Sequence, residues 1–298
     1  MNPVELLPVA VEATAVAAEL IRTRFPGTLT AKGDRDMASE VDFAVERAVR
    51  ALLRERTPGI GLLGEEEGGP ALDGELTWVL DPVDGTVNFV HGLPLCAVSL
   101  GLVRRRRPVL GVVEMPFLGS RYQAAEGEGA YADGQRLRAS GATTLAEAVV
   151  AVGDYAVGAD ADLLNRERLA VTAALVPRVQ RIRMLGTAAT DLAWVAAGRL
   201  DALVMLANNP WDTAAGVVLA REAGAAVVDR YGAEHDTGAV ETIAGPRPLL
   251  DEIRALIRAV GEDLAQHRLP VGGSEACPAT RPSATGGGRA PGRQPGTH

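Results

Sequence analysis

Several carboxylates follow apolar segments in this sequence, and they are its best candidates for catalytic or metal-binding residues. The most informative run reads Trp78-Val-Leu-Asp81-Pro-Val-Asp84-Gly85-Thr86-Val-Asn88-Phe. Here a strand-like stretch leads into Asp81 and Asp84, and two carboxylates displayed together at a sheet rim are costly to desolvate without a cation. Gly85 lets the backbone approach a ligand closely, and free amides beside it could bind a phosphoryl oxygen. The run predicts a cation and phosphate site, although Asp, Pro and Gly are also ordinary turn residues.

Two further acidic sites stand elsewhere in the chain. Glu65 begins a run of three glutamates directly after an apolar strand-like run, and Asp212 stands just before an apolar helical stretch. Taken alone, the glutamates could form a solvated acidic turn and Asp212 could be a helix N-cap. Taken with Asp81 and Asp84, they predict one cluster of carboxylates. Hard oxygen ligands without nearby His or Cys select magnesium or manganese over zinc.

The spacing of apolar residues predicts the helices and strands around these carboxylates. In the first half, helical spacing covers residues 4–24, and Ser39 could cap a second helix that stops before Pro58-Gly59. Short strand-like runs follow at Ile60–Leu63, Trp78–Leu80, Ala97–Val103, Val109–Glu114 and Arg121–Ala125. The stretch Arg104–Pro108 between two of these runs predicts a hairpin turn. This half is therefore predicted to be α+β, with two helices leading into a mostly antiparallel sheet.

The second half alternates between strand-like and helical runs. Strands are predicted at Val149–Val152, Arg181–Met184, Ala202–Leu206, Ala226–Val228 and near Glu241–Ala244. Helices are predicted at Ala161–Leu175, Ala188–Ala197, Thr213–Ala223 and Leu249–Leu264. Such alternation predicts an α/β layer arrangement. Residues 269–298 are rich in Gly, Pro, Ser, Thr and Arg without periodicity, so we expect a disordered tail there.

Composition bounds the class of protein. The chain has 298 residues, of which 47% are hydrophobic, and its formal net charge is −8. A globally acidic chain is a poor nonspecific nucleic-acid binder, because phosphate contacts need clustered Lys and Arg. The two cysteines, Cys96 and Cys277, stand in an apolar run and a polar tail, which disfavours a structural disulfide. With no signal-like N-terminus and no apolar run near 18 residues, we expect a cytoplasmic protein without a membrane partner.

The acidic strings resemble the signature of the inositol monophosphatase family in both order and spacing. The matching strings are Gly64-Glu65-Glu66, Asp81-Pro-Val-Asp84-Gly-Thr86-x-Asn88-Phe, Trp211-Asp212-x-Ala-Ala-Gly216, Gly186-Thr187-Ala188-Ala189 and the early Lys32, Asp36 and Asp42 segment. The resemblance covers roughly residues 5–260. It implies an α/β fold of layered α-β-α-β-α type, as in sugar phosphatases, and a metal-dependent phosphoric monoester hydrolase.

The resemblance also implies roles for the acidic residues. Glu65, Asp81 and the backbone carbonyl of Val83 would hold one Mg²⁺, and Asp81 would bridge to a second ion completed by Asp84 and Asp212. A third, weaker ion would lie near Glu65, so two to three ions are implied. Mn²⁺ is a possible substitute, and Li⁺ is expected to inhibit.

Catalytic and substrate contacts follow from the same resemblance. Thr86, oriented by Asp42, would position the attacking water together with Glu65, although Asp42 could instead be a solvent-facing helix residue. Amides of Gly85 and Thr86 would cradle the phosphate, with Asp212 beside the substrate and Lys32 near the pocket. Substrate hydroxyls would be read partly at a helix start, formed by Gly186, Thr187 and Ala188.

One departure concerns the substrate. In the inositol-specific branch an acidic residue binds a ring hydroxyl seven positions before the last metal aspartate, where this chain has Met205. Inositol-1-phosphate is the first candidate substrate. Histidinol phosphate, fructose-1,6-bisphosphate, a nucleotide 3′-phosphate and a cyclitol phosphate stay open for the same chemistry. A non-catalytic protein that binds metal or inositol phosphate is disfavoured, because every expected ligand and Thr86 are present.

The organisation of the chain can also be predicted. Residues 1–135 would form an α+β subdomain with most metal ligands, and residues 136–268 an α/β subdomain that supplies Asp212 and substrate contacts. Members of the family are commonly homodimers, so a homodimer is expected here as well.

Overall fold

The computed structural model of the chain describes residues 2–33 and 36–266. The tail predicted over residues 269–298 lies outside the described residues. The helices are η1 (Pro3–Leu6), α1 (Leu7–Thr23), α2 (Glu40–Arg56), α3 (Thr86–Val90), η2 (Leu145–Glu147), α4 (Ala161–Leu175), α5 (Ala188–Ala196), α6 (Pro210–Glu222) and α7 (Arg247–Gln266).

The strands belong to three sheets. A two-stranded sheet contains β1 (Leu29–Gly33) and β2 (Asp36–Ser39). A seven-stranded sheet contains β3 (Gly61–Gly64), β4 (Thr77–Asp84), β5 (Ala97–Arg104), β6 (Arg107–Met115), β7 (Ser120–Ala125), β8 (Gly129–Ala132) and β9 (Gln135–Arg136). A five-stranded sheet contains β10 (Val149–Val152), β11 (Arg181–Arg183), β12 (Ala202–Met205), β13 (Ala226–Val228) and β14 (Thr242–Gly245).

The seven-stranded sheet follows the order of the chain from β3 to β9, and only β3 and β4 run parallel. The mostly antiparallel sheet predicted for the first half is therefore confirmed. The predicted hairpin turn is confirmed too, because Arg105 and Arg106 connect β5 to β6 with φ values of 46° and 68°. Two positive φ values in a two-residue turn match the right-handed twist of the flanking strands.

The five-stranded sheet has the order β11-β10-β12-β14-β13. Strand β10 runs parallel to both of its neighbours, and β14 runs antiparallel to β12 and β13. Parallel neighbours need a crossover, which α4 provides between β10 and β11, while α5 leads from β11 to β12 on the other side of β10. The alternation of strands and helices predicted for this half is confirmed.

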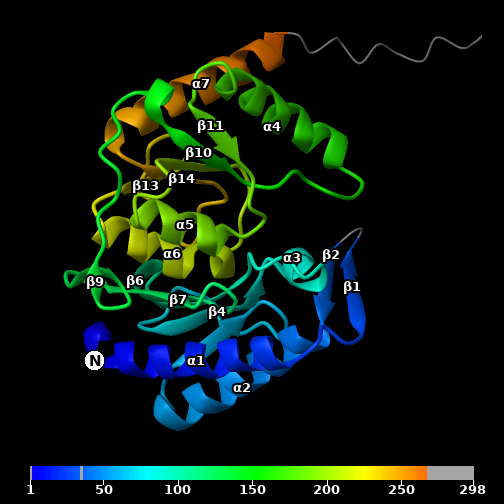
Figure 1. The fold of residues 1–298 in the computed structure, drawn as a ribbon, viewed down its shortest axis with the longest axis vertical. Coiled ribbons are helices and arrows are strands. Elements are labelled where there is room, and N and C mark those ends of the chain that lie inside the picture. Colours follow the sequence, from blue (N-terminus) through cyan, green and yellow to red (C-terminus); the bar gives the residue numbers. More distant parts are fainter. Residues whose placement is uncertain (1, 34–35, 267–298) are drawn as a thin grey trace, which may run out of the picture.

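Helices cover both faces of the two large sheets (Figure 1). Helices α1 and α2 pack on the outer face of the seven-stranded sheet, α5 and α6 lie between the two sheets, and α4 and α7 cover the five-stranded sheet. The approach of α6 is close, since a Cβ atom at Gly111 of β6 would lie 2.7 Å from Ala215 Cα of α6. The result is the layered α-β-α-β-α fold predicted from the resemblance.

Several boundaries differ from the prediction. Helix α6 begins at Pro210, three residues before the predicted start, because Asn209 takes the N-cap conformation and Pro suits a first helical turn. The turn predicted after Asp84 continues into the short helix α3. The hairpin of β1 and β2 was not predicted, because its polar, exposed first strand carries no apolar alternation.

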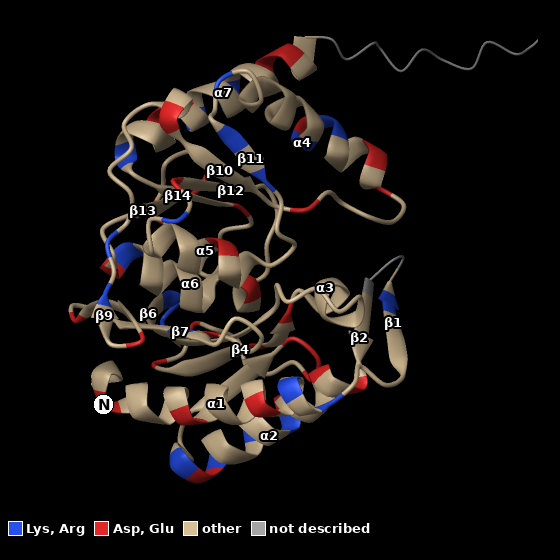
Figure 2. Cartoon of the chain, in the orientation of Figure 1, with Lys and Arg blue, Asp and Glu red and all other residues tan. Residues whose placement is uncertain are grey.

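Ion pairs fasten the β5–β6 hairpin to surrounding segments. Arg105 pairs with Glu75, Arg106 with Asp236 at 3.1 Å, and Arg107 with Glu126 at 3.0 Å. The charged segments of the fold are coloured in Figure 2, where acidic segments at the end of β4 and the starts of α5 and α6 lie on the α3 side of the molecule. Within the described residues, no helix is long and apolar enough to cross a membrane.

Candidate active site

The site is built on the last residues of β4, which is buried along its whole length. Asp81 pairs with Ser99 and Asp84 with Ala97 on β5, so the register shifts between the two aspartates. Such an irregularity re-aims side chains at the end of a strand. Asp81 Oδ1 accepts a hydrogen bond of 3.0 Å from the amide of Val83, which also stiffens the turn.

The four carboxylates predicted to form one cluster lie within electrostatic reach of one another. Burial raises the pKa of Asp81 well above its usual range, and the negative charges of Glu65, Asp84 and Asp212 raise it further. Burial likewise raises the pKa of Asp84 to about 6 and that of Asp212 to about 7. Like charges that face one another disfavour the ionised form. The four groups therefore share one electrostatic environment that a cation would stabilise.

Each of these side chains also has a partner within the protein. Asp84 accepts hydrogen bonds from the Thr187 hydroxyl and from the amides of Ala188 and Ala189, at 3.2 Å and 2.7 Å for the amides. Asp212 is the third residue of α6 and accepts a 2.7 Å bond from the amide of Asn209. The alternative in which Asp212 is itself the N-cap is wrong, because Asn209 occupies that position.

Asp42 and Thr86 meet beside the cluster. Thr86 Oγ1 lies 3.0 Å from Asp42 Oδ1 and 3.0 Å from the carbonyl oxygen of Val83. Asp42 is fully buried, and its Oδ2 accepts from the Ser39 amide at 2.9 Å and the Ser39 hydroxyl at 2.5 Å. The alternative of a solvent-facing Asp42 is therefore wrong. Burial raises its pKa, while the hydrogen bonds from Ser39 and Thr86 oppose that rise.

Glu65 stands at the turn after β3, opposite Lys32 of β1. The Lys32 ammonium donates to Glu65 Oε1 at 2.5 Å and to Glu66 Oε1 at 2.8 Å. Burial lowers the pKa of Lys32, but its bonds to the two glutamates outweigh this effect and raise the pKa above its usual value. The predicted proximity of Lys32 to the acidic site is thus present.

Glu46 of α2 binds the backbone of the same turn, and this contact was not predicted. Its buried carboxylate accepts from the amides of Glu66 at 2.9 Å and Glu67 at 3.1 Å, and from Arg50 at 2.5 Å. The signal was in the helical spacing, because residue 46 follows the buried Asp42 by four positions and so shares its face.

Gly85, directly after Asp84, packs closely against the residues that precede α5. It has a φ of 89°, and a Cβ atom there would lie 3.0 Å from the Leu95 carbonyl oxygen and 3.1 Å from that of Gly186. Only glycine combines this left-handed backbone with so close an approach. Thr187 is the N-cap of α5, and its hydroxyl accepts from the amide of Thr190.

A cavity of about 410 Å³ opens beside the carboxylates. The predicted site residues among its lining are Asp84, Gly186, Thr187, Ala188 and Asp212. An adjoining cavity of about 480 Å³ is lined by Gly85, Thr86 and Gly186. Met205 also lines the first cavity, together with Asp154 and Asp191, which were not predicted. Asp84 and Asp212 therefore border the same cavity as Gly186, Thr187 and Ala188, and Gly186 borders both cavities, whereas Glu65 and Asp81 line neither.

This layered fold contains a buried β-strand that ends in carboxylates, followed by a glycine with a positive φ and a threonine. Together with the family match, these features define an enzyme that hydrolyses phosphate monoesters. The model of the inositol monophosphatase family matches residues 2–262. The chain belongs to the inositol monophosphatase family.

Known relatives agree with this assignment. The inositol-1-monophosphatase ImpA of Mycolicibacterium smegmatis is 38% identical over 231 residues, which are 78% of this chain and 83% of that protein. A fructose-1,6-bisphosphatase/inositol-1-monophosphatase of Thermotoga maritima is 36% identical over 78% of this chain and 86% of its own length. The solved structure of an inositol monophosphatase from Thermotoga maritima matches with a TM-score of 0.80 and 31% identity, covering 87% of this chain and 99% of that one.

Proposed function

We propose that this chain is a Mg²⁺-dependent phosphatase that hydrolyses inositol-1-phosphate to inositol and inorganic phosphate. The observation that carries the proposal is the cluster of Glu65, Asp81, Asp84 and Asp212, whose charges act on one another at the end of β4. Relatives with 37–38% identity carry names of inositol monophosphatases, which supports the choice of substrate.

The donor set fits magnesium. Carboxylates and a backbone carbonyl are hard oxygen ligands, which Mg²⁺ prefers. Within residues 2–33 and 36–266, no three Asp, Glu, His or Cys side chains are arranged so that they could hold a metal ion as they stand. Asp84, Asp212 and Glu65 accept hydrogen bonds from protein groups in this structure, so metal binding would exchange these hydrogen bonds for metal contacts.

We assign the metal ligands as follows. Glu65, Asp81 and the Val83 carbonyl would hold one ion, and Asp81, Asp84 and Asp212 a second, with a weaker third ion near Glu65. When bound, the ions would neutralise phosphoryl oxygens, activate water and stabilise the departing alkoxide. Mn²⁺ would substitute for Mg²⁺, and Li⁺ would inhibit.

The attacking water would be positioned by Thr86 together with Glu65. The Thr86 hydroxyl has one proton, and Asp42 at 3.0 Å is a buried acceptor for it. With its proton directed to Asp42, the Thr86 oxygen presents its lone pairs, so it can accept a hydrogen bond from water. Asp42 is thus the orienting residue of the pair.

The phosphate would lie against the amides of Gly85 and Thr86, which begin α3 and so have no helical acceptor. The alcohol part would extend towards Gly186, Thr187 and Ala188 along the wall of the cavity. Lys32 would balance the charge of Glu65 at the entrance to the cluster. We further propose that the active form is a cytoplasmic homodimer, and that residues 1–135 and 136–268 are its two subdomains.

A second candidate keeps the chemistry and changes the substrate. Met205 lines the cavity and cannot accept a hydrogen bond from a substrate hydroxyl as a carboxylate would. One relative carries fructose-1,6-bisphosphatase in its name, so fructose-1,6-bisphosphate is the leading alternative, beside histidinol phosphate, nucleotide 3′-phosphates and cyclitol phosphates.

The test is a panel of phosphate esters at fixed Mg²⁺ concentration, comparing kcat/KM for inositol-1-phosphate, fructose-1,6-bisphosphate, histidinol phosphate and adenosine 3′-phosphate. We expect the highest value for inositol-1-phosphate. A higher value for another ester would change the substrate and keep the reaction. No phosphate release from any ester would contradict the proposed function.

A further inference from the structure

The cavity beside the carboxylate cluster has a second acidic wall that the proposed mechanism does not use. Its volume of about 410 Å³ lies within the range of small-molecule sites. Asp84 and Asp212 of the cluster line it, and the second wall consists of Asp154 and Asp191. The start of α5, which carries Asp191, is bonded to Asp84, so the second wall adjoins the cluster and would border the alcohol part of an ester whose phosphate lies there.

Asp191 is the inner member of this wall. It lies in the first turns of α5 with only 2% of its surface exposed. Its Oδ1 is sealed from solvent and has no hydrogen-bond partner among the residues that the structure describes. A buried polar atom without a partner destabilises a fold, and such atoms are rare unless a ligand or water completes them. The cavity is the side from which a partner can come.

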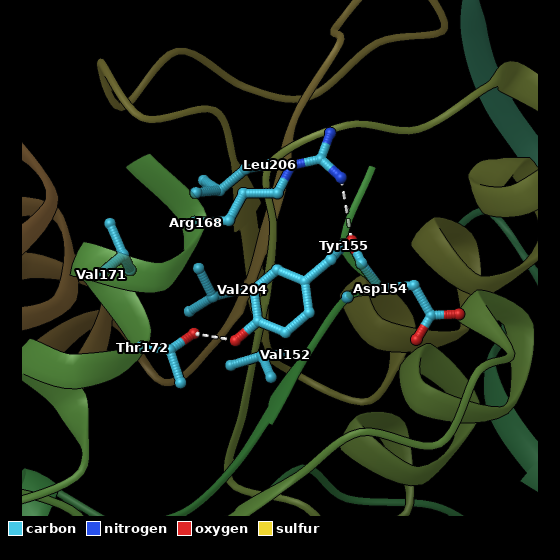
Figure 3. Close-up of a pocket in the computed structure, with 9 residues that line it drawn as sticks. Val152, Asp154, Tyr155, Arg168, Val171, Thr172, Val204 and Leu206 are labelled. Atoms are coloured by element: carbon cyan, nitrogen blue, oxygen red, sulfur yellow. Dashed lines mark hydrogen bonds between the residues drawn. The ribbon is translucent and has the colours of Figure 1, made fainter. Parts of the chain in front are cut away.

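Asp154 is the outer member and is exposed to solvent. It follows β10, next to β12, where Gly153 donates its amide to the Val204 carbonyl at 3.0 Å. Within the described part of the chain, its carboxylate has no hydrogen bond or ion pair. Figure 3 shows this carboxylate pointing away from the Arg168 guanidinium, which instead donates to the backbone carbonyl of Asp154 at 2.9 Å. Arg168 thus fixes the segment and leaves the carboxylate free.

The two carboxyl groups line the same cavity. Burial raises the pKa of Asp191, and the charges of Asp84 and then Asp154 raise it further, so Asp191 lies within electrostatic reach of Asp154. Met205, at the end of β12, packs against Gly153, since a Cβ atom on Gly153 would lie 2.9 Å from Met205 Cγ. The polar groups for an alcohol are therefore supplied by residues 154 and 191, while Met205 supplies an apolar surface.

We propose that Asp191 and Asp154 are specificity-determining residues that hydrogen-bond the hydroxyl groups of the alcohol part of the substrate. This inference rests on the proposed function and adds residues that select the substrate without taking part in phosphate cleavage.

The test compares two esters that differ in these hydroxyls, inositol-1-phosphate and p-nitrophenyl phosphate, at saturating Mg²⁺. In Asp191→Ala we expect kcat/KM for inositol-1-phosphate to fall about 10- to 100-fold, mainly through KM, because a hydrogen bond to a carboxyl group is lost. The value for p-nitrophenyl phosphate should change less than about twofold. Asp191→Asn, which keeps a donor and an acceptor, should restore most of the difference.

A thermal melt gives an independent readout. Removing a buried carboxyl without a partner should leave the Tm of Asp191→Ala at or above that of the wild type. Asp154→Ala, at an exposed position, should lower kcat/KM for inositol-1-phosphate by about threefold to tenfold and leave that for p-nitrophenyl phosphate unchanged. If Asp191→Ala fails to fold, this variant alone tests the inference. The matched control is Asp160→Ala, an exposed aspartate before α4 whose side chain makes no capping bond.

Equal losses on both esters, or no loss on either, would overturn the inference while the phosphatase stands. Wild-type protein that hydrolyses neither ester would overturn the proposed function and this inference with it.

Discussion

The hydroxyl of Thr187 donates a hydrogen bond to the carboxylate of Asp84, which lies 103 positions earlier in the chain. The amides of Ala188 and Ala189 donate to the same carboxylate. Because Thr187 is the N-cap of α5, Asp84 occupies the positive end of that helix. One side chain at the end of β4 therefore fixes the helix that borders the alcohol side of the cavity.

This double role makes Asp84→Asn informative. The variant should lose at least about 1,000-fold in phosphate release, because a neutral amide cannot replace a carboxylate as a metal ligand. Its Tm should fall only slightly, since the remaining carbonyl still accepts from the start of α5. Phosphate release and a thermal melt measure the two effects, with the exposed Asp73→Asn as control. Turnover near that of the wild type would contradict the metal assignment.

The contact between Thr86 and Asp42 predicts coupled kinetics. Thr86→Val and Asp42→Asn should each lower kcat by about 100- to 1,000-fold, in the range of a group that positions a proton or water. The double variant should have a kcat only slightly lower than that of either single variant, because both changes remove the same hydrogen bond between Thr86 and Asp42. Steady-state kinetics of all four proteins form the cycle. Fully additive losses would show that the two residues act independently.

Glu46 should act on the site through the turn that it holds. In Glu46→Gln, the amide group cannot accept from all three of its present donors, so we expect a loss of about 1–3 kcal/mol in the free energy of unfolding. Activity should fall as well, because Glu65 stands at the same turn. Urea unfolding measures the first effect and phosphate release the second. The exposed Glu55→Gln serves as control, and an unchanged unfolding midpoint in Glu46→Gln would refute the positioning role.

The strands and long helices could be predicted because their apolar spacing is set by burial of one face or both. Asp81, Asp84 and Asp212 could be predicted for a different reason, since their strings combine charge with strand ends and helix starts. The burial of Asp42 could have been found as well, because Ser39 and Asp42 have the spacing of a capping box.

Other features depend on packing that one sequence does not display. Asp191 is one aspartate within an apolar helix, and its missing partner becomes visible only when α5 is placed between two sheets. Asp154 lies beside the cavity because β10, which it follows, is the neighbour of β12 in the sheet. This pairing brings Gly153 next to Met205, although the two are far apart in the chain. The exposed hairpin of β1 and β2, which carries Lys32, lacks the alternation from which strands are predicted.

His235 should make stability depend on pH away from the active site. Burial, followed by the charge of Arg221, lowers its pKa from an ordinary value of 6.5 to about 4. Between these values the unfolded chain binds a proton that the folded chain does not. Its contribution to stability is therefore complete above pH 6.5 and is lost as pH falls towards 4, by about 3 kcal/mol.

Chemical unfolding at pH 7 and pH 4.5 checks this contribution. His235→Gln should show a smaller loss of stability over that interval than the wild type, because the glutamine does not titrate. The exposed His91→Gln should behave as the wild type does. If the stability of the wild type and of His235→Gln depended on pH in the same way, groups other than His235 would be responsible for the loss at low pH.

We propose that the carboxylates at the end of β4 form a magnesium-dependent phosphatase site. The most direct test measures phosphate release from inositol-1-phosphate by chelator-treated protein while Mg²⁺ is added back. We expect no turnover without the metal and a full return of activity as Mg²⁺ rises, with no return in Asp81→Asn. Turnover that persists in excess chelator, or an active Asp81→Asn protein, would contradict it.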